Sequence, residues 1–374
     1  KTIMIINILF LLFFLNLCFC IKLPLISNVF GSHMVLQREK FVNVWGWSQN
    51  DIVTIVLENS NGHIVSNSQV KPDPTTGLWK TQLKPMPGNK EKFTLTISDK
   101  LEKQTLLDIV FGEVWLCSGQ SNMVFPLKFA YNSSEELKSA SQREEMIRFI
   151  DLGTEWANVV AKPASTINNL PIPWTRANAT ALVYPKTNTW PGLSALCYMF
   201  GRRLLEHFQH QVPVGLISSN WGGTIIQAWM PPHAITDCPP PTSPQPPIFQ
   251  PRLQTFDKRM ALPRSFASLQ GVNPANNYTT LFNGMIHPFA LDKTAFYNIK
   301  GVIWYQGEQN SVFHRKSGGP PLYACLFRQL IESWRALFGH ETGFHFAQLS
   351  GSTDYYAAGD PQQWYPQLRL AQAS

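Results

Sequence analysis

The feature that most constrains the fold is a series of short apolar runs that alternate with helical patterns after residue 108. Four runs are typical of buried strands: Ile109–Cys117, Val214–Ser218, Gly301–Tyr305 and Phe344–Leu349. Between them, Leu193–Phe208 and Leu322–Phe338 carry apolar residues at helical spacing. Strands that alternate with helices predict a parallel α/β sheet with helices packed on it.

The part of the chain before this series has a different pattern. Ile52–Glu58 and Phe93–Ser98 are short runs rich in β-branched residues, and turn signals such as Asn61-Gly62 separate them. We therefore expect a β-rich, sandwich-like domain over residues 21–108 and an α/β domain over residues 109–374. Within the second domain, the run 238–251 holds seven prolines, which predicts an exposed insertion loop outside the sheet.

The N-terminus carries an apolar run, Ile3–Phe19, that follows Lys1. Its length of about 17 residues is at the lower edge for a membrane span. The pattern predicts a secretory signal peptide over residues 1–20, with a signal anchor as the alternative. We expect no stable membrane insertion after cleavage, and an extracellular or lysosomal location.

Four cysteines remain after the predicted signal peptide: Cys117, Cys197, Cys238 and Cys325. None has the spacing of a zinc site, so we expect no metal site. In an oxidising compartment they can form two disulfides, in three possible pairings. Three glycosylation sequons begin at Asn132, Asn178 and Asn277, which agrees with a glycoprotein of the secretory pathway.

The charge of the chain argues against one class of partner. Charged residues make up only 15% of the chain, and the formal net charge is +7. The Lys and Arg residues are scattered rather than gathered into patches, so nucleic acid is not an expected partner.

The run Gly112-Glu113-Val114-Trp115-Leu116-Cys117-Ser118-Gly119-Gln120-Ser121-Asn122-Met123 carries the main chemical signal. A predicted strand ends near Cys117, and Ser121 follows where a helix could begin. Ligands of open α/β sheets bind at the carboxyl ends of the strands. A serine in that place can act as a nucleophile in acyl transfer, and its own backbone N–H can stabilise an oxyanion. The alternative is that Ser121 only caps a helix.

Two other predicted strands end in polar runs. Gly222-Gly223-Thr224 follows one, and glycine there lets a backbone N–H approach a ligand closely. Gln306, Glu308 and Asn310 follow the other, and an asparagine amide is a suitable oxyanion donor. The alternatives are a simple turn at the glycines and a helix cap at Asn310.

Together these three runs resemble the SGNH hydrolase superfamily, and specifically the sialate O-acetylesterase family. The runs His33-Met34-Val35-Leu36-Gln37-Arg38 and Asn283-Gly284-Met285-Ile286-His287-Pro288 are also similar to that family, so the resemblance covers nearly all of Lys22–Ser374. It implies a flavodoxin-like, three-layer α/β/α fold. It also implies hydrolysis of O-acetyl esters on sialic acid or sialoglycans, with no cofactor.

Carried over by position, the resemblance implies a role for several residues. Ser121 resembles the nucleophile, and the backbone N–H groups of Ser121 and Gly223 resemble oxyanion donors together with the amide of Asn310. Further pocket residues are expected at Gln120, Gln306, Glu308 and His287.

A serine nucleophile needs a base to accept its proton. In the SGNH superfamily this base is the His of an Asp-x-x-His block, but no Asp in this chain is followed by His at that spacing. Of the His residues in the runs that resemble the family, His287 is the candidate for a catalytic role, and a structural role suits it equally well. We expect the catalytic His and Asp to lie beyond Ser374, which would leave this chain inactive or nearly so.

Two other functions fit the same sequence. One is a non-catalytic glycan-binding protein that uses the same pocket and the aromatic residues Trp115, Trp221 and Trp304. The other is an acetylesterase that acts on another acetylated sugar, such as xylan, because the family motifs position only the acetyl group.

Overall fold

The computed structural model describes residues 23–50, 52–185, 190–238, 274–312, 319–350 and 364–373. The predicted signal peptide, residues 1–20, lies outside these ranges. So does the proline-rich run beyond Cys238.

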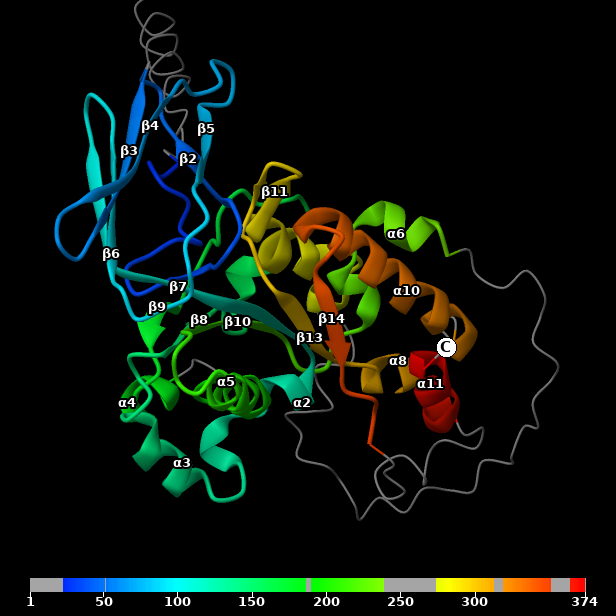
Figure 1. Ribbon diagram of the computed structural model, residues 1–374. Helices are drawn as coiled ribbons and strands as arrows, with labels where there is room; N and C mark the ends of the chain where they lie inside the picture. The colour runs from blue at the N-terminus through cyan, green and yellow to red at the C-terminus, as the bar shows by residue number, and fades with distance from the viewer. Residues whose placement is uncertain are drawn as a thin grey trace, which may run out of the picture.

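A mainly parallel sheet forms the centre of the larger part of the molecule (Figure 1). Its strands are β7 (Lys103–Gly119), β8 (Ile147–Asp151), β9 (Ile172–Arg176), β10 (Val214–Asn220), β13 (Gly301–Tyr305) and β14 (Gly343–Phe346). The order is β9-β8-β10-β7-β13-β14, and only β9, at one edge, is antiparallel. Without the β8–β9 edge, the order β10-β7-β13-β14 matches the first four positions of the flavodoxin-like order 2-1-3-4-5.

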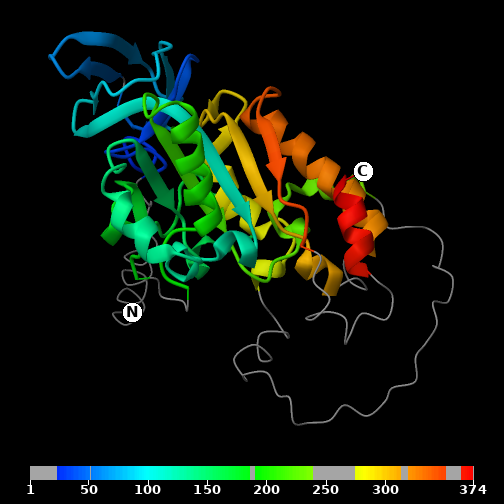
Figure 2. The ribbon, with the colours of Figure 1, turned by 60° about the horizontal axis from the view of Figure 1, so that its bottom comes forward.

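Helices cover both faces of this sheet. Successive side chains of a strand point to opposite faces, so apolar residues on both faces need a helix to bury them. Leu116 and Trp304 belong to a buried cluster that includes Trp334 of α10 (Gly319–Phe338). Cys117 and Ile303 belong to a second cluster that includes Tyr198 of α5 (Ala195–His207). Figures 1 and 2 show α5 and α10 on opposite sides of the sheet. The expected three-layer α/β/α fold is confirmed.

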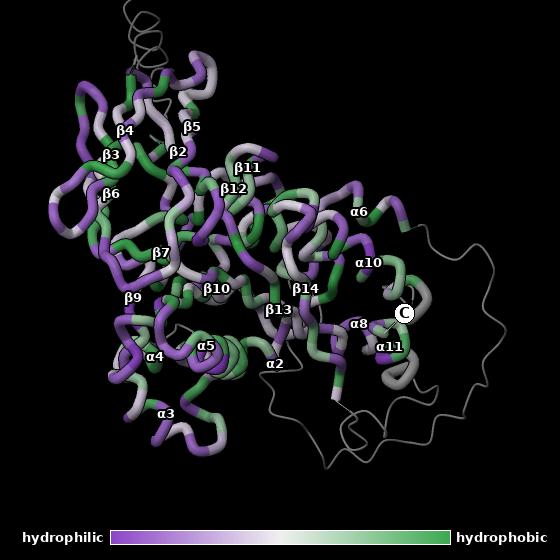
Figure 3. The backbone as a smooth tube through the Cα atoms, in the orientation of Figure 1, coloured by the Kyte–Doolittle hydropathy of each residue, from purple (hydrophilic) through white to green (hydrophobic). Residues whose placement is uncertain are grey.

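The other elements are short and connect these layers. The other α-helices in the described ranges are α2 (Ser121–Val124), α3 (Ser133–Ala140), α4 (Ala179–Leu182), α6 (Pro232–Thr236), α8 (Glu308–Val312) and α11 (Trp364–Ala373). The 3-10 and π turns are η1 (Leu127–Phe129), η2 (Trp156–Asn158), η3 (Ile226–Trp229), η4 (Pro274–Asn276), η5 (Phe282–Ile286) and η6 (His287–Phe289). A small hairpin pairs β11 (Ala290–Asp292) with β12 (Ala295–Phe296). The mostly hydrophilic residues of α3 lie at the edge of the molecule (Figure 3).

The N-terminal part is built from two antiparallel arrangements of strands. In one, β3 (Val53–Asn59), β4 (Ile64–Val70) and β6 (Phe93–Ser98) continue onto the first residues of β7. In the other, β2 (Val42–Trp47) pairs with β5 (Leu78–Leu83). Alternate residues of β3 and β6 are buried, as the sequence pattern predicts for a sheet covered on one face.

One strand, β7, belongs to both parts of the molecule. From Lys103 to Ile109 it pairs with β6 in antiparallel fashion. From Val110 onward it pairs in parallel with β1 (Val35–Gln37), β10 and β13. Asp108 has a φ of 56°, which is uncommon for a residue other than glycine. The domain boundary expected between residues 108 and 109 therefore falls within a continuous strand.

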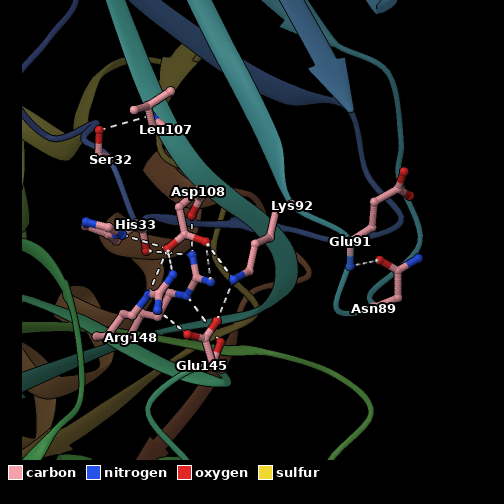
Figure 4. A network of polar contacts seen from close by, with 10 residues as sticks. Ser32, His33, Asn89, Glu91, Lys92, Leu107, Asp108, Glu145 and Arg148 are labelled. Atoms are coloured by element: carbon pink, nitrogen blue, oxygen red, sulfur yellow. Dashed lines mark hydrogen bonds and ion pairs between the residues drawn. The ribbon is translucent and has the colours of Figure 1, made fainter. Parts of the chain in front are cut away.

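We call the place where β7 passes from the β-rich part into the central sheet the joint. A cluster of charged groups surrounds Asp108 there (Figure 4). The carboxylate of Asp108 contacts His33 Nδ1 at 2.6 Å, Arg148 Nη2 at 3.2 Å and Arg176 Nη2 at 2.7 Å. Arg148 is completely buried, and its Nη1 also donates to the backbone oxygen of Asp108. A buried guanidinium of this kind requires paired charges and acceptors. The joint is therefore held by a specific ionic network.

Two disulfides join elements that are distant in sequence. Cys117 of β7 is bonded to Cys197 of α5, and Cys238, which follows α6, is bonded to Cys325 of α10. The expectation of two disulfides is confirmed, and the structure selects one of the three possible pairings. Among the described helices, none combines the length and the apolar character that a membrane span requires.

Candidate active site

The ends of three neighbouring parallel strands form one edge of the central sheet. Gly119 of β7 lies in register with Asn220 of β10 and with Tyr305 of β13. The segments that follow these residues therefore begin at the same edge. The three polar runs that follow predicted strands therefore begin side by side.

Gly119 allows β7 to lie unusually close to β13 as it ends. Its φ is 139°, and a Cβ atom at this position would lie only 2.1 Å from the backbone oxygen of Tyr305. The next backbone N–H, that of Gln120, donates to the same oxygen at 2.9 Å. Only glycine fits this close approach, which fixes the point at which the chain turns into α2.

Ser121 is the first residue of α2 and is half-buried at this edge. The N-cap of α2 is Gln120, so the alternative that Ser121 serves as the cap is wrong. Within the described part of the chain, neither the hydroxyl nor the backbone N–H of Ser121 donates a hydrogen bond to another residue. An N–H group in the first turn has no acceptor within its helix. With respect to the described residues, Ser121 thus presents a hydroxyl and a backbone N–H that are both free to donate.

The glycine pair after β10 lies against Ser121. A Cβ atom added to Gly222 would lie 3.6 Å from both the Cα and the Cβ of Ser121. Gly223 has a φ of 71°, and among the described residues its N–H has no acceptor. The side chain of Asn276 fixes this turn, because its Nδ2 donates to the Gly223 oxygen and its Oδ1 accepts from the Ile225 N–H, each at 2.9 Å. No local pattern in the sequence marks Asn276 as part of this site.

Glu308 connects α8 to the residues on either side of Ser121. One carboxylate oxygen accepts a hydrogen bond from Gln120 Nε2, and the other accepts from Asn122 Nδ2. Glu308 is buried, and this burial raises the pKa of its carboxyl although the two amide donors lower it. Gln120 and Glu308, both expected in the pocket, are hydrogen-bonded to each other, and their role in the pocket stays a prediction. Asn122 is a further partner of Glu308 that no sequence pattern marks.

Gln306 and Asn310 are buried and hold α8 against the segment after β10. Gln306 Nε2 donates to the Thr224 oxygen at 2.9 Å and to Asn310 Oδ1 at 2.7 Å. Asn310 Oδ1 also accepts from the Ile226 N–H at 2.9 Å, while its Nδ2 donates to Gln227 Oε1 at 3.1 Å. Asn310 is the third residue of α8, so the alternative of a helix cap is wrong.

His287 makes contacts of a structural kind. Its Nδ1 lies 2.8 Å from the backbone oxygen of Ala164, which can only accept, so Nδ1 is the donor. Its ring packs on the edge of Phe282. In the described part of the chain it has no hydrogen bond to Ser121, Gln120 or Glu308. Its expected place in the pocket stays a prediction.

The aromatic residues suggested for glycan binding do not face solvent. Trp115 and Trp221 are 7% and 6% exposed, and Trp304 is fully buried, so none of them offers a free ring face. That expectation is wrong. Trp156 in η2, which the sequence analysis missed, is 50% exposed.

The sequons lie in different surroundings. Asn132 and Asn277 are exposed, whereas Asn178 is half-buried and its Oδ1 caps α4 by accepting from the Ala181 N–H. Within the described residues, no group of three or more His, Cys, Asp or Glu side chains is placed to hold a metal ion.

The chemistry open to this edge of the sheet is acyl transfer. It presents a serine hydroxyl that lies against the turn at Gly222 and Gly223. The backbone N–H groups of Ser121 and Gly223 have no acceptor among the described residues. Such donors stabilise the charge that develops on a carbonyl oxygen when a serine attacks it.

Comparison with known proteins places this arrangement in a family. Residues 111–350 match the family of carbohydrate esterases described as sialic acid-specific acetylesterases. The chain is 30% identical over 369 residues to the sialate O-acetylesterase of Rattus norvegicus and 28% identical over 362 residues to that of Homo sapiens. These matches cover 93% of this chain but only 64% and 61% of the two relatives, so the chain spans less than two thirds of their length.

A solved structure agrees with this match. A carbohydrate acetylesterase from Xanthomonas citri superposes with a TM-score of 0.69 at 25% sequence identity, covering 93% of this chain and 65% of that one. The family model accounts for well over half of the chain and includes all three strand ends. The chain therefore belongs to the carbohydrate esterase family of sialic acid-specific acetylesterases.

Proposed function

We propose that the protein hydrolyses O-acetyl esters of sialic acids, free or within sialoglycans, with Ser121 as the nucleophile. The observation that carries the proposal is the placement of Ser121 against Gly222, in the glycine turn that follows β10. Among the described residues, the backbone N–H groups of Ser121 and Gly223 have no acceptor. Membership of the family and the names of the curated relatives support the acetyl ester and the sialic acid.

In the proposed reaction, Ser121 Oγ attacks the acetyl carbonyl carbon and a base accepts the hydroxyl proton. The backbone N–H groups of Ser121 and Gly223 donate to the resulting oxyanion. The sugar hydroxyl then leaves with a proton, and water hydrolyses the acetyl-serine ester. The amide of Asn310 is the third donor by family resemblance, although in the structure it donates to Gln227.

The base is the part of this mechanism that the described site does not supply. No Asp-x-x-His block occurs in the sequence, and within the described part of the chain no His is hydrogen-bonded to Ser121. We therefore propose that this chain alone releases acetate slowly. A positioned general base contributes roughly 10²- to 10⁴-fold to such a reaction.

Chemical rescue with imidazole tests both parts of the proposal. Acetate release from O-acetylated N-acetylneuraminic acid is measured with and without added imidazole. We expect the unmodified chain to release acetate slowly and imidazole to accelerate this release. In Ser121→Ala, acetate release should be lost both with and without imidazole. Ser118→Ala is the matched control, because Ser118 is buried in β7 and its hydroxyl has no hydrogen-bond partner among the described residues.

The outcomes separate the alternatives. Undiminished acetate release by Ser121→Ala rules out Ser121 as the nucleophile. Fast release without imidazole contradicts the missing base but not the esterase. Binding of the sugar without release, even with imidazole, supports a glycan-binding protein. Faster acetate release from acetylated xylan than from the O-acetylated sialic acid would assign the esterase to a different sugar substrate.

We also propose that the protein enters the secretory pathway and reaches the cell exterior or the lysosome. The two disulfides and the exposed sequons at Asn132 and Asn277 support this location. Treatment of the cellular protein with an N-glycosidase should lower its apparent mass. An unchanged mass in secreted material would argue against glycosylation.

A further inference from the structure

Trp156 is the most exposed tryptophan among the described residues, with half of its surface open to solvent. It lies in η2, in the segment that follows β8. Because β8 pairs in parallel with β10, this segment begins at the same edge of the sheet as the candidate active site.

Trp156 is connected to the site through Trp221. The two rings pack edge to face, with their centroids 5.1 Å apart and an angle of 63° between their planes. The backbone N–H of Trp221 donates to the Gly119 oxygen at 3.0 Å, and the next residue, Gly222, lies against Ser121. Trp156 therefore packs on the residue that immediately precedes the glycine turn beside Ser121.

The segment that carries Trp156 has little regular structure but is firmly held. The fully buried Asn158 bonds to three groups of this segment: its Nδ2 donates to the Asn169 oxygen, and its Oδ1 accepts from the N–H groups of Asn168 and Asn169. Asn28 forms two further hydrogen bonds with the backbone of Ile167.

The run Asn283–His287 holds the same segment from the other side. Asn283 Nδ2 donates to the Val160 oxygen at 3.2 Å, the Ala164 N–H donates to the Asn283 oxygen at 2.9 Å, and His287 Nδ1 donates to the Ala164 oxygen. A Cβ atom at Gly284 would lie only 1.8 Å from the Asn158 oxygen, so this position excludes every other residue. The run Asn283–His287 therefore holds the segment that carries Trp156 in place by hydrogen bonds and close packing.

We propose that Trp156 is a sugar-binding platform on which a pyranose ring of the substrate stacks. A pyranose carries a face of C–H groups, and these are attracted to the negative face of an indole ring. Stacking also removes apolar surface of both partners from water. This inference rests on the proposed carbohydrate substrate and adds a binding residue to it.

A single ring of this kind suits a small ligand better than a protein partner. A stable protein interface covers about 800 Å² on each side, far more than one indole offers. The neighbouring side chains on the same segment, such as Glu155 and Asn168, are polar. Because an indole N–H can only donate a hydrogen bond, Trp156 is assigned to binding of the substrate.

Saturation-transfer NMR with N-acetylneuraminic acid and its methyl glycoside tests the platform without any need for catalysis. We expect transfer to be strongest at the ring C–H protons of the sugar. Trp156→Ala should weaken binding roughly tenfold, which corresponds to about 1.4 kcal/mol. Trp156→Phe should retain binding within about threefold, because a ring remains to stack and to pack on Trp221. Tyr131→Ala is the control, since Tyr131 is an aromatic residue that is 98% exposed elsewhere.

Unchanged affinity in Trp156→Ala would overturn the inference. So would an equal loss in Tyr131→Ala, or the absence of any transfer to the sugar in the unmodified chain. The result is distinguishable from a failure of the proposed function: weaker binding by Trp156→Ala supports the platform even if acetate release proves independent of Ser121. A melting curve for each variant verifies that it folds.

Discussion

At the residue scale, the proposed nucleophile depends on a buried carboxylate that holds the side chains on either side of it. Glu308 accepts from Gln120 and from Asn122, the residues immediately before and after Ser121. Glu308→Gln leaves only one accepting oxygen and places an amide group against an amide donor. Hydrogen bonds to charged groups contribute about 1.5–3 kcal/mol, so we expect acetate release in imidazole to fall by about tenfold or more.

The control for this variant is Glu341→Gln, because the Glu341 side chain is 87% exposed and, among the described residues, forms an ion pair only with Lys40. Sugar binding should remain unchanged in both variants. Since burial raises the pKa of Glu308, its protonated form persists to a higher pH than usual, and protonation puts a hydrogen where an amide donor already lies. The rate should therefore fall as the pH drops through this raised pKa, and the Gln variant should lack that step. An identical pH profile would contradict the role of Glu308.

The residues of the site differ in how far the sequence reveals them. Ser121 and Gly223 follow predicted strands, and this position alone indicates that they lie at the same edge. Asn276 cannot be found in this way, because it acts on Gly223 from 53 residues away and no local pattern marks the contact. Asn122 likewise has its partner 186 residues further along the chain.

At the scale of elements, the segment after β8 shows how a residue of a recognisable run can serve a distant part of the site. His287 donates to the Ala164 oxygen, which helps to hold the Trp156 segment. In His287→Asn the side-chain amide can replace Nδ1 as donor, whereas His287→Ala has no donor. We expect hydrogen exchange of the backbone over residues 156–168 to become faster in the Ala variant and to stay near the original rate in the Asn variant.

The same pair of variants separates the structural role of His287 from a catalytic one. A structural His predicts that the Asn variant keeps the acetate release of the unmodified chain. A general base at this position predicts that both variants lose it, because an amide cannot accept the serine proton. Loss of activity in the Asn variant with unchanged hydrogen exchange would therefore refute our interpretation of His287.

The strands and helices were predictable where the apolar pattern is continuous. Gly301–Tyr305 was predicted residue for residue as β13, and the helix predicted at Leu193–Phe208 became α5. The strand β8 was missed because Arg148 and Asp151 interrupt its apolar residues, yet both are buried. Arg148 can be buried there because it meets the carboxylate of Asp108, a contact that only the folded chain creates.

At the scale of the whole molecule, β7 joins the β-rich part to the sheet that carries the site. Asp108 lies at the joint, roughly 35 Å along the strand from Gly119 at a rise of about 3.3 Å per residue. The network around Asp108 is therefore a feature of assembly and not of the active site (Figure 4). The sequence pattern placed a boundary at this residue because it could not show that one strand continues through it.

The joint makes a prediction about acid stability. Burial alone raises the pKa of Asp108, but hydrogen bonds from His33 and Arg176 and the charges of Arg148 and Arg176 lower it to about 2 from the usual 3.8. A depressed pKa means that the ionised carboxyl stabilises the fold above pH 3.8, and that this stabilisation is lost as the pH falls toward 2. Asp108→Asn should remove this part of the acid dependence.

The same variant should also destabilise the protein at neutral pH, because it leaves the fully buried Arg148 without its counter-charge. Removing one partner of a buried pair costs about 3 kcal/mol or more. Urea unfolding at pH 7 and between pH 2 and 5 measures both effects, with the exposed Asp237→Asn as control. An unchanged free energy of unfolding at pH 7 would show that Arg148 finds other partners. If instead stability falls while the folded variant still binds the sugar, the joint holds the two parts together without shaping the distant site.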